Sequence, residues 1–173
     1  MRRAAAGALL LALAASPVLA QSGADIIGRK DIPASVKNAV LCDPAEPETI
    51  FGRPFAGGYV FAWPCPGNHA NFIQALVFAE NKSGAGARLL RFPSSRRKNQ
   101  GDEEPALELA NVRWFPARRE LLSFFIDAEG GGFCRTEARW RLVGRRPEPV
   151  VVSMRKTRDC DGKRGWVTVV PPR

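Results

Sequence analysis

Four cysteines carry the most distinctive side-chain chemistry in this chain: Cys42, Cys65, Cys134 and Cys160. A cysteine can act as a reactive thiol, bind a metal ion or form half of a disulfide. No two of the four are close in sequence, and the chain has a single histidine, His69, so the pattern does not predict a zinc site. If the chain is exported, an even number of cysteines predicts two structural disulfides.

The first twenty residues have the features of a secretory signal peptide. Arg2 and Arg3 form a basic start, residues 4–15 are apolar, and small residues lead to a cleavage site after Ala20. We therefore expect the protein in the periplasm of a Gram-negative bacterium. Residues 21–30 are expected to form a flexible leader and residues 31–173 a single disulfide-stabilised domain. No later segment is long and apolar enough to predict a membrane span.

Residues that could perform acid–base catalysis are few. His69 lies in a turn-like sequence, and Asp127 and Glu129 follow an expected strand shortly before Cys134. A carboxylate pair or a histidine can transfer protons, so these three residues define an alternative in which the protein is an envelope hydrolase. The sequence has no phosphate-binding glycine loop, no nucleophile elbow and no histidine–glutamate metal motif. We expect no enzymatic activity, no cofactor and no metal.

The charge of the chain bears on its partners. Without Arg2 and Arg3, 24 basic residues stand against 17 acidic ones, a net charge of +7. Such a balance suits an anionic envelope component, and another envelope protein is the alternative partner, whereas the scattered basic residues do not predict nucleic-acid binding. A polar loop at 93–105 is a candidate partner-binding segment. Its charged residues are Arg96, Arg97, Lys98, Asp102, Glu103 and Glu104.

A β-hairpin is expected near the C-terminus. Residues 134–142 and 150–157 alternate between apolar and polar side chains as strands do, and the turn-rich segment 144–149 joins them. If the hairpin folds about Pro147, positions whose numbers add up to 294 face each other.

This register predicts one disulfide directly. It places two pairs on one face of the hairpin, Trp140 with Met154 and Cys134 with Cys160. Opposed residues in an antiparallel pair approach closely enough for a disulfide, so Cys134 and Cys160 would close the open end of the hairpin. By elimination, Cys42 pairs with Cys65.

The rest of the chain predicts an all-β fold. Strands are expected at 57–63, 71–80, 87–92, 107–115, 120–127 and 165–170, in addition to the two of the hairpin. A short helix is expected over 31–41, with Asp31 as its cap. About eight short antiparallel strands at regular spacing are typical of a sandwich or a barrel-like sheet. The four tryptophans, Trp63, Trp114, Trp140 and Trp166, lie in these strands and are expected to pack in the core.

Several short motifs occur in a fixed order from Trp63 onward. They comprise Pro64-Cys65 with Gly67 and Asn71, then Asn111 with Trp114, Leu122-Ser123 with Phe125, Gly130 and Gly132 with Cys134 and Trp140, and finally Cys160, Gly162, Trp166 and Thr168. In this respect the chain resembles the C-terminal region of the exported bacterial family called domain of unknown function 1176. It departs from the family pattern at Ala70, Phe133 and Arg135. The resemblance implies export and disulfides, and it supplies no activity or site.

Together these features predict a non-catalytic binding or scaffolding domain of the cell envelope. Two alternatives stay open. One is the hydrolase that uses Asp127, Glu129 or His69, and the other is an inhibitor of a hydrolase.

Overall fold

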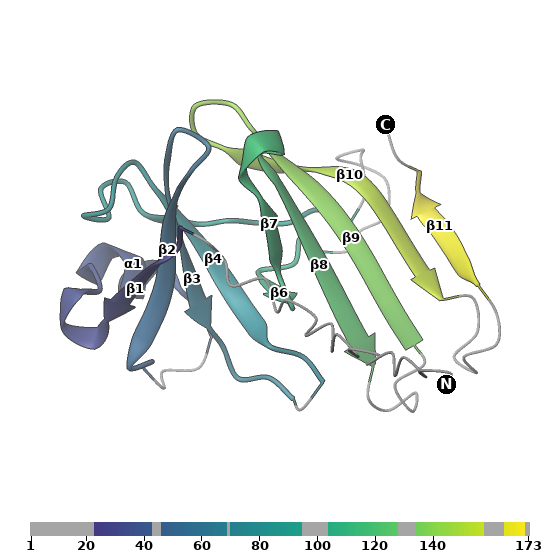
Figure 1. The fold of residues 1–173 in the computed structure, drawn as a ribbon, viewed down its shortest axis with the longest axis horizontal. Coiled ribbons are helices and arrows are strands. Elements are labelled where there is room, and N and C mark those ends of the chain that lie inside the picture. Colours follow the sequence, from purple (N-terminus) through teal and green to yellow (C-terminus); the bar gives the residue numbers. More distant parts are fainter. Residues whose placement is uncertain are drawn as a thin grey trace, which may run out of the picture.

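The protein is a two-sheet β-sandwich. A computed structural model describes residues 23–42, 46–68, 70–94, 104–127, 134–157 and 165–171. These residues form two antiparallel sheets, neither of which closes into a barrel, together with one short α-helix (Figure 1). The predicted all-β class is therefore confirmed, and the sandwich is the correct alternative. No helix among the described residues has the length and apolar content needed to cross a bilayer.

The first sheet contains six strands and the second contains five. The first consists of β1 (Asp25–Gly28), β2 (Thr49–Phe55), β3 (Gly58–Pro64), β4 (Ile73–Ala79) and β5 (Arg88–Leu89) in that order, with β6 (Glu108–Ala110) also paired to β4. The second has the order β11 (Trp166–Val170), β10 (Glu148–Thr157), β9 (Cys134–Val143), β8 (Glu120–Asp127) and β7 (Arg113–Phe115). The helix α1 (Ala34–Ala39) contacts β4 and β5, and Figure 1 shows it at the left of the molecule, with β11 at the right.

The first sheet is covered on both faces. One face packs on the second sheet through a core that includes Phe78, Leu121 and Trp140. The other face packs on the α1 region through a second cluster that includes Val36 and Phe61. Both β3 and β4 are therefore apolar on their two faces, which is why 71–80 has no clear alternation in sequence. The strand predicted there is confirmed.

One predicted strand is in fact two, because the chain changes sheets within it. Residues 107–115 divide into β6, in the first sheet, and β7, in the second. Asn111 lies between them in the left-handed conformation, with φ of 48°. Asparagine tolerates this conformation better than most residues, so the corner has a local sequence cause. The next connection is a hairpin, because β7 pairs with β8 across residues 116–119.

The β9–β10 hairpin exists, but its predicted register is wrong. Trp140 faces Val151 rather than Met154, and Met154 faces Ala138. The turn is centred between Arg145 and Arg146 instead of on Pro147, and a bulge at Val152 then shifts the pairing by one residue. A bulge inserts one unpaired residue into a strand, so the register beyond it cannot follow from counting outward from the turn.

The N-terminal segment is more ordered than the sequence predicts. Residues 25–28, assigned to a flexible leader, form β1 on the edge of the first sheet and pair with β2. The helix is shorter than expected, spanning Ala34–Ala39, and its N-cap is Pro33 with no side-chain cap. Asp31 instead ends a 3₁₀ turn, so its predicted capping role is wrong.

Candidate functional site

Cys42 and Cys65 form a disulfide, as the sequence predicts. Their Cα atoms are 5.7 Å apart, and the bond ties the chain after α1 to the end of β3. The carboxylate of Glu108 lies close to both sulfur atoms, which gives a group of three nominal metal ligands. A disulfide sulfur is not a thiolate, however, and the thiolate is the form that binds a metal. This group therefore does not make a metal centre.

Cys134 begins β9 and lies opposite Asp127, the last residue of β8. Its predicted partner, Cys160, lies outside the described residues. Cys42 and Cys65 are bonded to each other, and no described cysteine is a free thiol. The Cys134–Cys160 pairing stays a prediction.

Most of the other predicted site residues also lie outside the described part of the chain. These are His69, Glu129, Arg96, Arg97, Lys98, Asp102 and Glu103. Glu104 is described and is exposed ahead of β6, and Asp127 is half-buried at the end of β8. The catalytic alternative and the partner loop at 93–105 therefore stay predictions.

Two asparagines that carry the family resemblance, Asn71 and Asn111, make hydrogen bonds that reach the second sheet. The amide of Asn71 accepts a hydrogen bond from the Ile126 N–H at 2.8 Å and donates to the Ile126 carbonyl at 2.6 Å. The amide nitrogen of Asn111 donates to Asn71 Oδ1 and to the Phe124 carbonyl. Asn71 belongs to the first sheet's side of the sandwich, whereas Phe124 and Ile126 belong to β8. The two asparagines therefore join the sheets.

Ser123 adds a second polar link of the same kind. It is buried, and its hydroxyl donates to the carbonyl of Ala110, the last residue of β6, at 2.8 Å. Buried polar groups are stable only when they are hydrogen-bonded, and this network meets that requirement. These family-like positions hold the fold together at the point where the chain changes sheets.

A hollow at the turn end of the sandwich is also structural in origin. It is lined by Ala56, Gly57, Arg119, Gly144 and Arg145. The guanidinium of Arg119 donates to the carbonyls of Ala56 and Gly144, at 3.0 and 3.1 Å. It thereby ties the β2–β3 turn to the β9–β10 turn. Both of these hydrogen bonds come from Nη2, whereas the buried Nε of Arg119 has no hydrogen-bond partner in the described part of the chain.

The outward face of the second sheet is the strongest candidate surface. Leu121, Ala138 and Trp140 point into the core, so the alternate residues on the same strands point the other way. We call this outward surface the open face. Its described residues are Arg113, Phe115, Glu120, Leu122, Phe124, Ile126, Arg135, Glu137, Arg139, Arg141, Val143, Glu148, Val150, Ser153, Arg155, Thr157, Trp166 and Thr168. None of them belongs to either core cluster.

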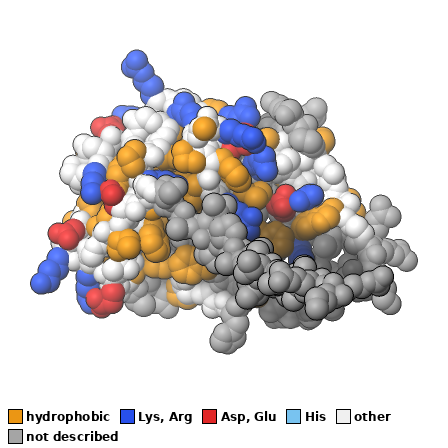
Figure 2. Space-filling view, in the orientation of Figure 1, with side chains coloured by type: hydrophobic (Ala, Val, Ile, Leu, Met, Phe, Trp, Pro, Cys, Tyr) orange, Lys and Arg blue, Asp and Glu red, His pale blue; other side chains and the backbone are white. Residues whose placement is uncertain are grey.

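The open face is basic and contains aromatic rings. Its five arginines and three glutamates give a net charge of +2. Val143, Val150 and Trp166 are more than a third exposed. Figure 2 shows basic, acidic and hydrophobic side chains interspersed over β8 to β10, where the described residues are in view. A mixed face of this kind differs from the covered faces of the first sheet, which are apolar.

A buried carboxylate organises one end of the open face. Only 4% of the Glu120 side chain is exposed, and Arg141 Nη2 donates to its Oε1 at 2.6 Å. Arg139 Nη1 lies 3.7 Å from Glu120 Oε2, and its guanidinium also stacks over the ring of Phe115 at 5.5 Å. Two cations share one carboxylate, so this row keeps a net positive charge.

At the other end of the open face, Arg155 and Glu137 form a bidentate ion pair. Arg155 donates through Nε and Nη2 to the two carboxylate oxygens of Glu137, each at 2.9 Å. The hydrogen bonds to Glu137 raise the pKa of Arg155 above its ordinary value. The same guanidinium lies 4.6 Å from the centre of the Trp166 ring, and that ring lies 6.4 Å from the ring of Phe124. Trp166 therefore lies at the surface rather than in the core, contrary to expectation, whereas Trp63 and Trp140 are buried as predicted.

Sequence reasoning did not identify the open face as a site. Alternation places Arg139 and Arg141 opposite Trp140 and Leu142, and that signal is visible in the sequence. The contacts of Arg155 with Glu137 and Trp166 depend on the pairing of three strands. That pairing includes a bulge in β10, which sequence patterning did not reveal.

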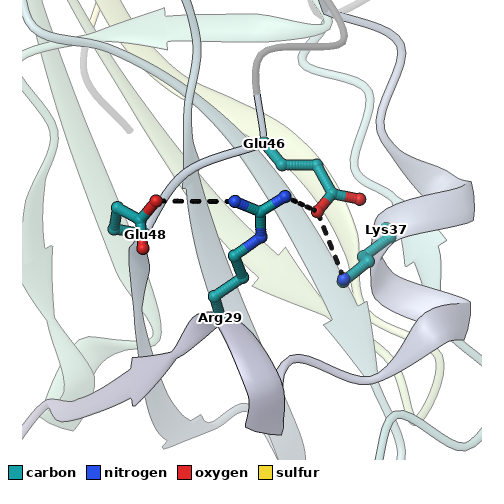
Figure 3. A network of polar contacts seen from close by, with 4 residues as sticks. All are labelled: Arg29, Lys37, Glu46 and Glu48. Carbon is teal, nitrogen blue, oxygen red and sulfur yellow. Dashed lines mark hydrogen bonds and ion pairs between the residues drawn. The ribbon is translucent and has the colours of Figure 1, made fainter.

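A second charged cluster lies away from the open face, around α1. Figure 3 shows Arg29 between Glu46 and Glu48, with Lys37 also bound to Glu46. The ion-pair distances are 3.2 to 3.5 Å. Two basic and two acidic groups balance here, so the cluster joins the 3₁₀ turn and α1 to the segment before β2 without creating a net charge.

Comparisons with protein families, with characterised proteins and with solved structures find no match for this chain.

Proposed function

We propose that this chain is an exported, non-catalytic binding domain of the cell envelope, and that its open face holds an anionic partner. The observation that carries the proposal is a sheet face with five arginines and exposed apolar groups that no described core cluster covers. The expected signal peptide and the family resemblance support export. The net charge of the mature chain supports an anionic partner over a cationic one.

The ion pairs of the open face favour binding rather than opposing it. Glu137 fixes the guanidinium of Arg155, so less side-chain freedom is lost when a ligand binds. An arginine has five N–H groups, and two of those on Arg155 donate to Glu137. The others can donate to a carboxylate or phosphate, the groups that a planar guanidinium recognises best.

Two arginines allow a matched test of this proposal. Arg155, on the open face, and Arg29, beside α1, are each paired with glutamate and about half exposed, at 47% and 53%. Replacement of either by glutamine lowers the net charge by one. Binding of the mature protein to polygalacturonate, an anionic polymer, is measured by isothermal titration calorimetry at two salt concentrations.

We expect Arg155→Gln to weaken binding about three- to tenfold, as loss of a charge-assisted hydrogen bond does, and to reduce the dependence on salt. Arg29→Gln should bind like the unmodified protein. Thermal unfolding of both variants controls for loss of structure. Equal effects of the two substitutions, or no binding by the unmodified protein, would contradict the proposal.

A further inference from the structure

The open face contains a compact group at its β10–β11 end that combines a ring with a fixed cation. Trp166 contributes an indole ring that is 36% exposed, and Arg155 contributes a guanidinium held by Glu137. Phe124 continues the aromatic surface beyond Trp166. Thr157 and Thr168 lie in register beside Trp166 and Arg155 and project from the same face. We call this group the Trp166 subsite.

From this arrangement we infer that the anionic partner is an acidic polysaccharide, and that the Trp166 subsite binds one of its sugar-acid units. This inference rests on the proposed function. The C–H groups on the flat face of a pyranose carry partial positive charge, and an aromatic ring presents a negative face to them. The carboxylate of the same sugar can accept hydrogen bonds from Arg155, while the threonine hydroxyls can bond to sugar hydroxyls.

The composition of the open face favours a polysaccharide over an acidic protein. The centre of a protein–protein interface is usually depleted of charge and rich in closely packed apolar anchors. Here ion pairs run across the face, with Glu120 beside Arg139 at one end and Glu137 beside Arg155 at the other, so the face carries charge along its length rather than closely packed apolar anchors.

Three polymers separate the possible sources of affinity. Polygalacturonate supplies both sugar rings and carboxylates, poly-L-glutamate supplies carboxylates without rings, and dextran supplies rings without charge. Each is titrated into the mature protein by calorimetry at matched monomer concentration and moderate salt. Trp166→Ala removes the ring, and Trp166→Phe restores an aromatic surface at an edge strand that either residue should tolerate.

We expect the protein to bind polygalacturonate at least about fivefold more tightly than poly-L-glutamate, because stacking on an aromatic side chain adds to the charge term. Dextran should bind more weakly than polygalacturonate. Trp166→Ala should remove the preference for polygalacturonate while leaving poly-L-glutamate binding unchanged, and Trp166→Phe should keep most of the preference. Circular dichroism of both variants checks that the sheet is intact.

The other outcomes distinguish the two proposals. Equal binding of the two anionic polymers, or a preference that survives Trp166→Ala in the folded variant, would overturn the sugar-acid subsite while leaving an anion-binding face. Failure of both anionic polymers to bind would overturn the proposed function and this inference together. A loss of poly-L-glutamate binding in Trp166→Ala equal to the loss for polygalacturonate would show that the ring does not recognise sugar.

Discussion

Tyr59 is the single tyrosine of the chain, and its hydroxyl is engaged in the structure. It is buried in the first sheet and donates a hydrogen bond of 2.5 Å to Asp25 Oδ2 in β1. Lys82 donates to the same oxygen at 2.8 Å. The three side chains therefore attach β1, which is an edge strand, to the middle of its sheet.

The titration of Tyr59 gives a direct test of this attachment. Burial, followed by the hydrogen bond to Asp25, raises the pKa of Tyr59 above its ordinary value of about 10. The folded state then keeps a proton that the unfolded state loses, so its contribution to stability is complete below about pH 10 and falls as the pH rises further. Ultraviolet absorbance should show no tyrosine ionisation until the protein unfolds.

The variant Tyr59→Phe separates this effect from general alkaline unfolding. It should lose about 1 kcal/mol of stability at neutral pH, the typical value of one hydrogen bond, and should lose less additional stability than the unmodified protein as the pH rises above about 10. Ionisation of Tyr59 at an ordinary pKa in the folded protein would show that its hydroxyl is exposed and that β1 is not attached in this way.

The pKa of Asp25 shifts in the opposite direction, because Asp25 accepts the hydrogen bond that Tyr59 donates. Hydrogen bonds from Lys82 and then Tyr59 hold the pKa of this carboxyl below its ordinary value. A depressed carboxyl pKa stabilises the folded state above the unfolded pKa, near pH 4, and that stabilisation is lost as the pH falls through the folded value. The hydrogen bonds of Asp25 with Tyr59 and Lys82 therefore stabilise the attachment of β1 most between about pH 4 and about pH 10.

The connection between β6 in the first sheet and β7 in the second depends on Asn111, the residue at which the chain changes sheets. Asn111 combines a left-handed backbone with hydrogen bonds to Asn71 and to the carbonyls of Ala70 and Phe124. Its side-chain oxygen also accepts a hydrogen bond from the Phe72 N–H at 3.0 Å. The backbone conformation and the amide therefore both contribute to joining the two sheets.

Two substitutions separate these contributions. Asn111→Ala should cost about 2–4 kcal/mol in chemical denaturation, because it leaves buried groups unpaired and places an alanine at positive φ. Asn111→Gly loses the same hydrogen bonds but accepts the backbone, so it should be about 1 kcal/mol less harmful. If alanine and glycine had equal effects, the left-handed backbone would not matter at this position.

Elements were predictable from sequence where the pattern is local. Strands β3, β4, β8 and β11 follow from runs of apolar and alternating residues, and the disulfide between Cys42 and Cys65 follows from elimination. The switch at Asn111 was missed because residues 107–115 look continuous in sequence. The β9–β10 register was wrong because a bulge at Val152 changes the pairing, and such a bulge is decided by packing between strands. β1 was missed because four residues carry too short a pattern.

At the scale of the whole molecule, the two sheets differ in how they are covered. The first is enclosed by the second sheet and by the α1 region, whereas the second has one core-facing side and one open face. The open face could not be predicted from the sequence, because the sequence does not show which of the two sheets is packed on both faces. The arginines of β9 were visible, but the contribution of Trp166 required the tertiary arrangement.

Mapping of polygalacturonate binding by nuclear magnetic resonance tests the central claim most directly. Backbone amide shifts of the isotope-labelled mature protein are followed during titration with short oligomers of the polymer. We predict that the shifts change along β8 to β11, most strongly near Glu137, Arg155 and Trp166, and stay constant in α1, β1 and β2. Shift changes centred on α1 and the Arg29 cluster, with none on β9 and β10, would contradict the assignment of the open face as the binding surface.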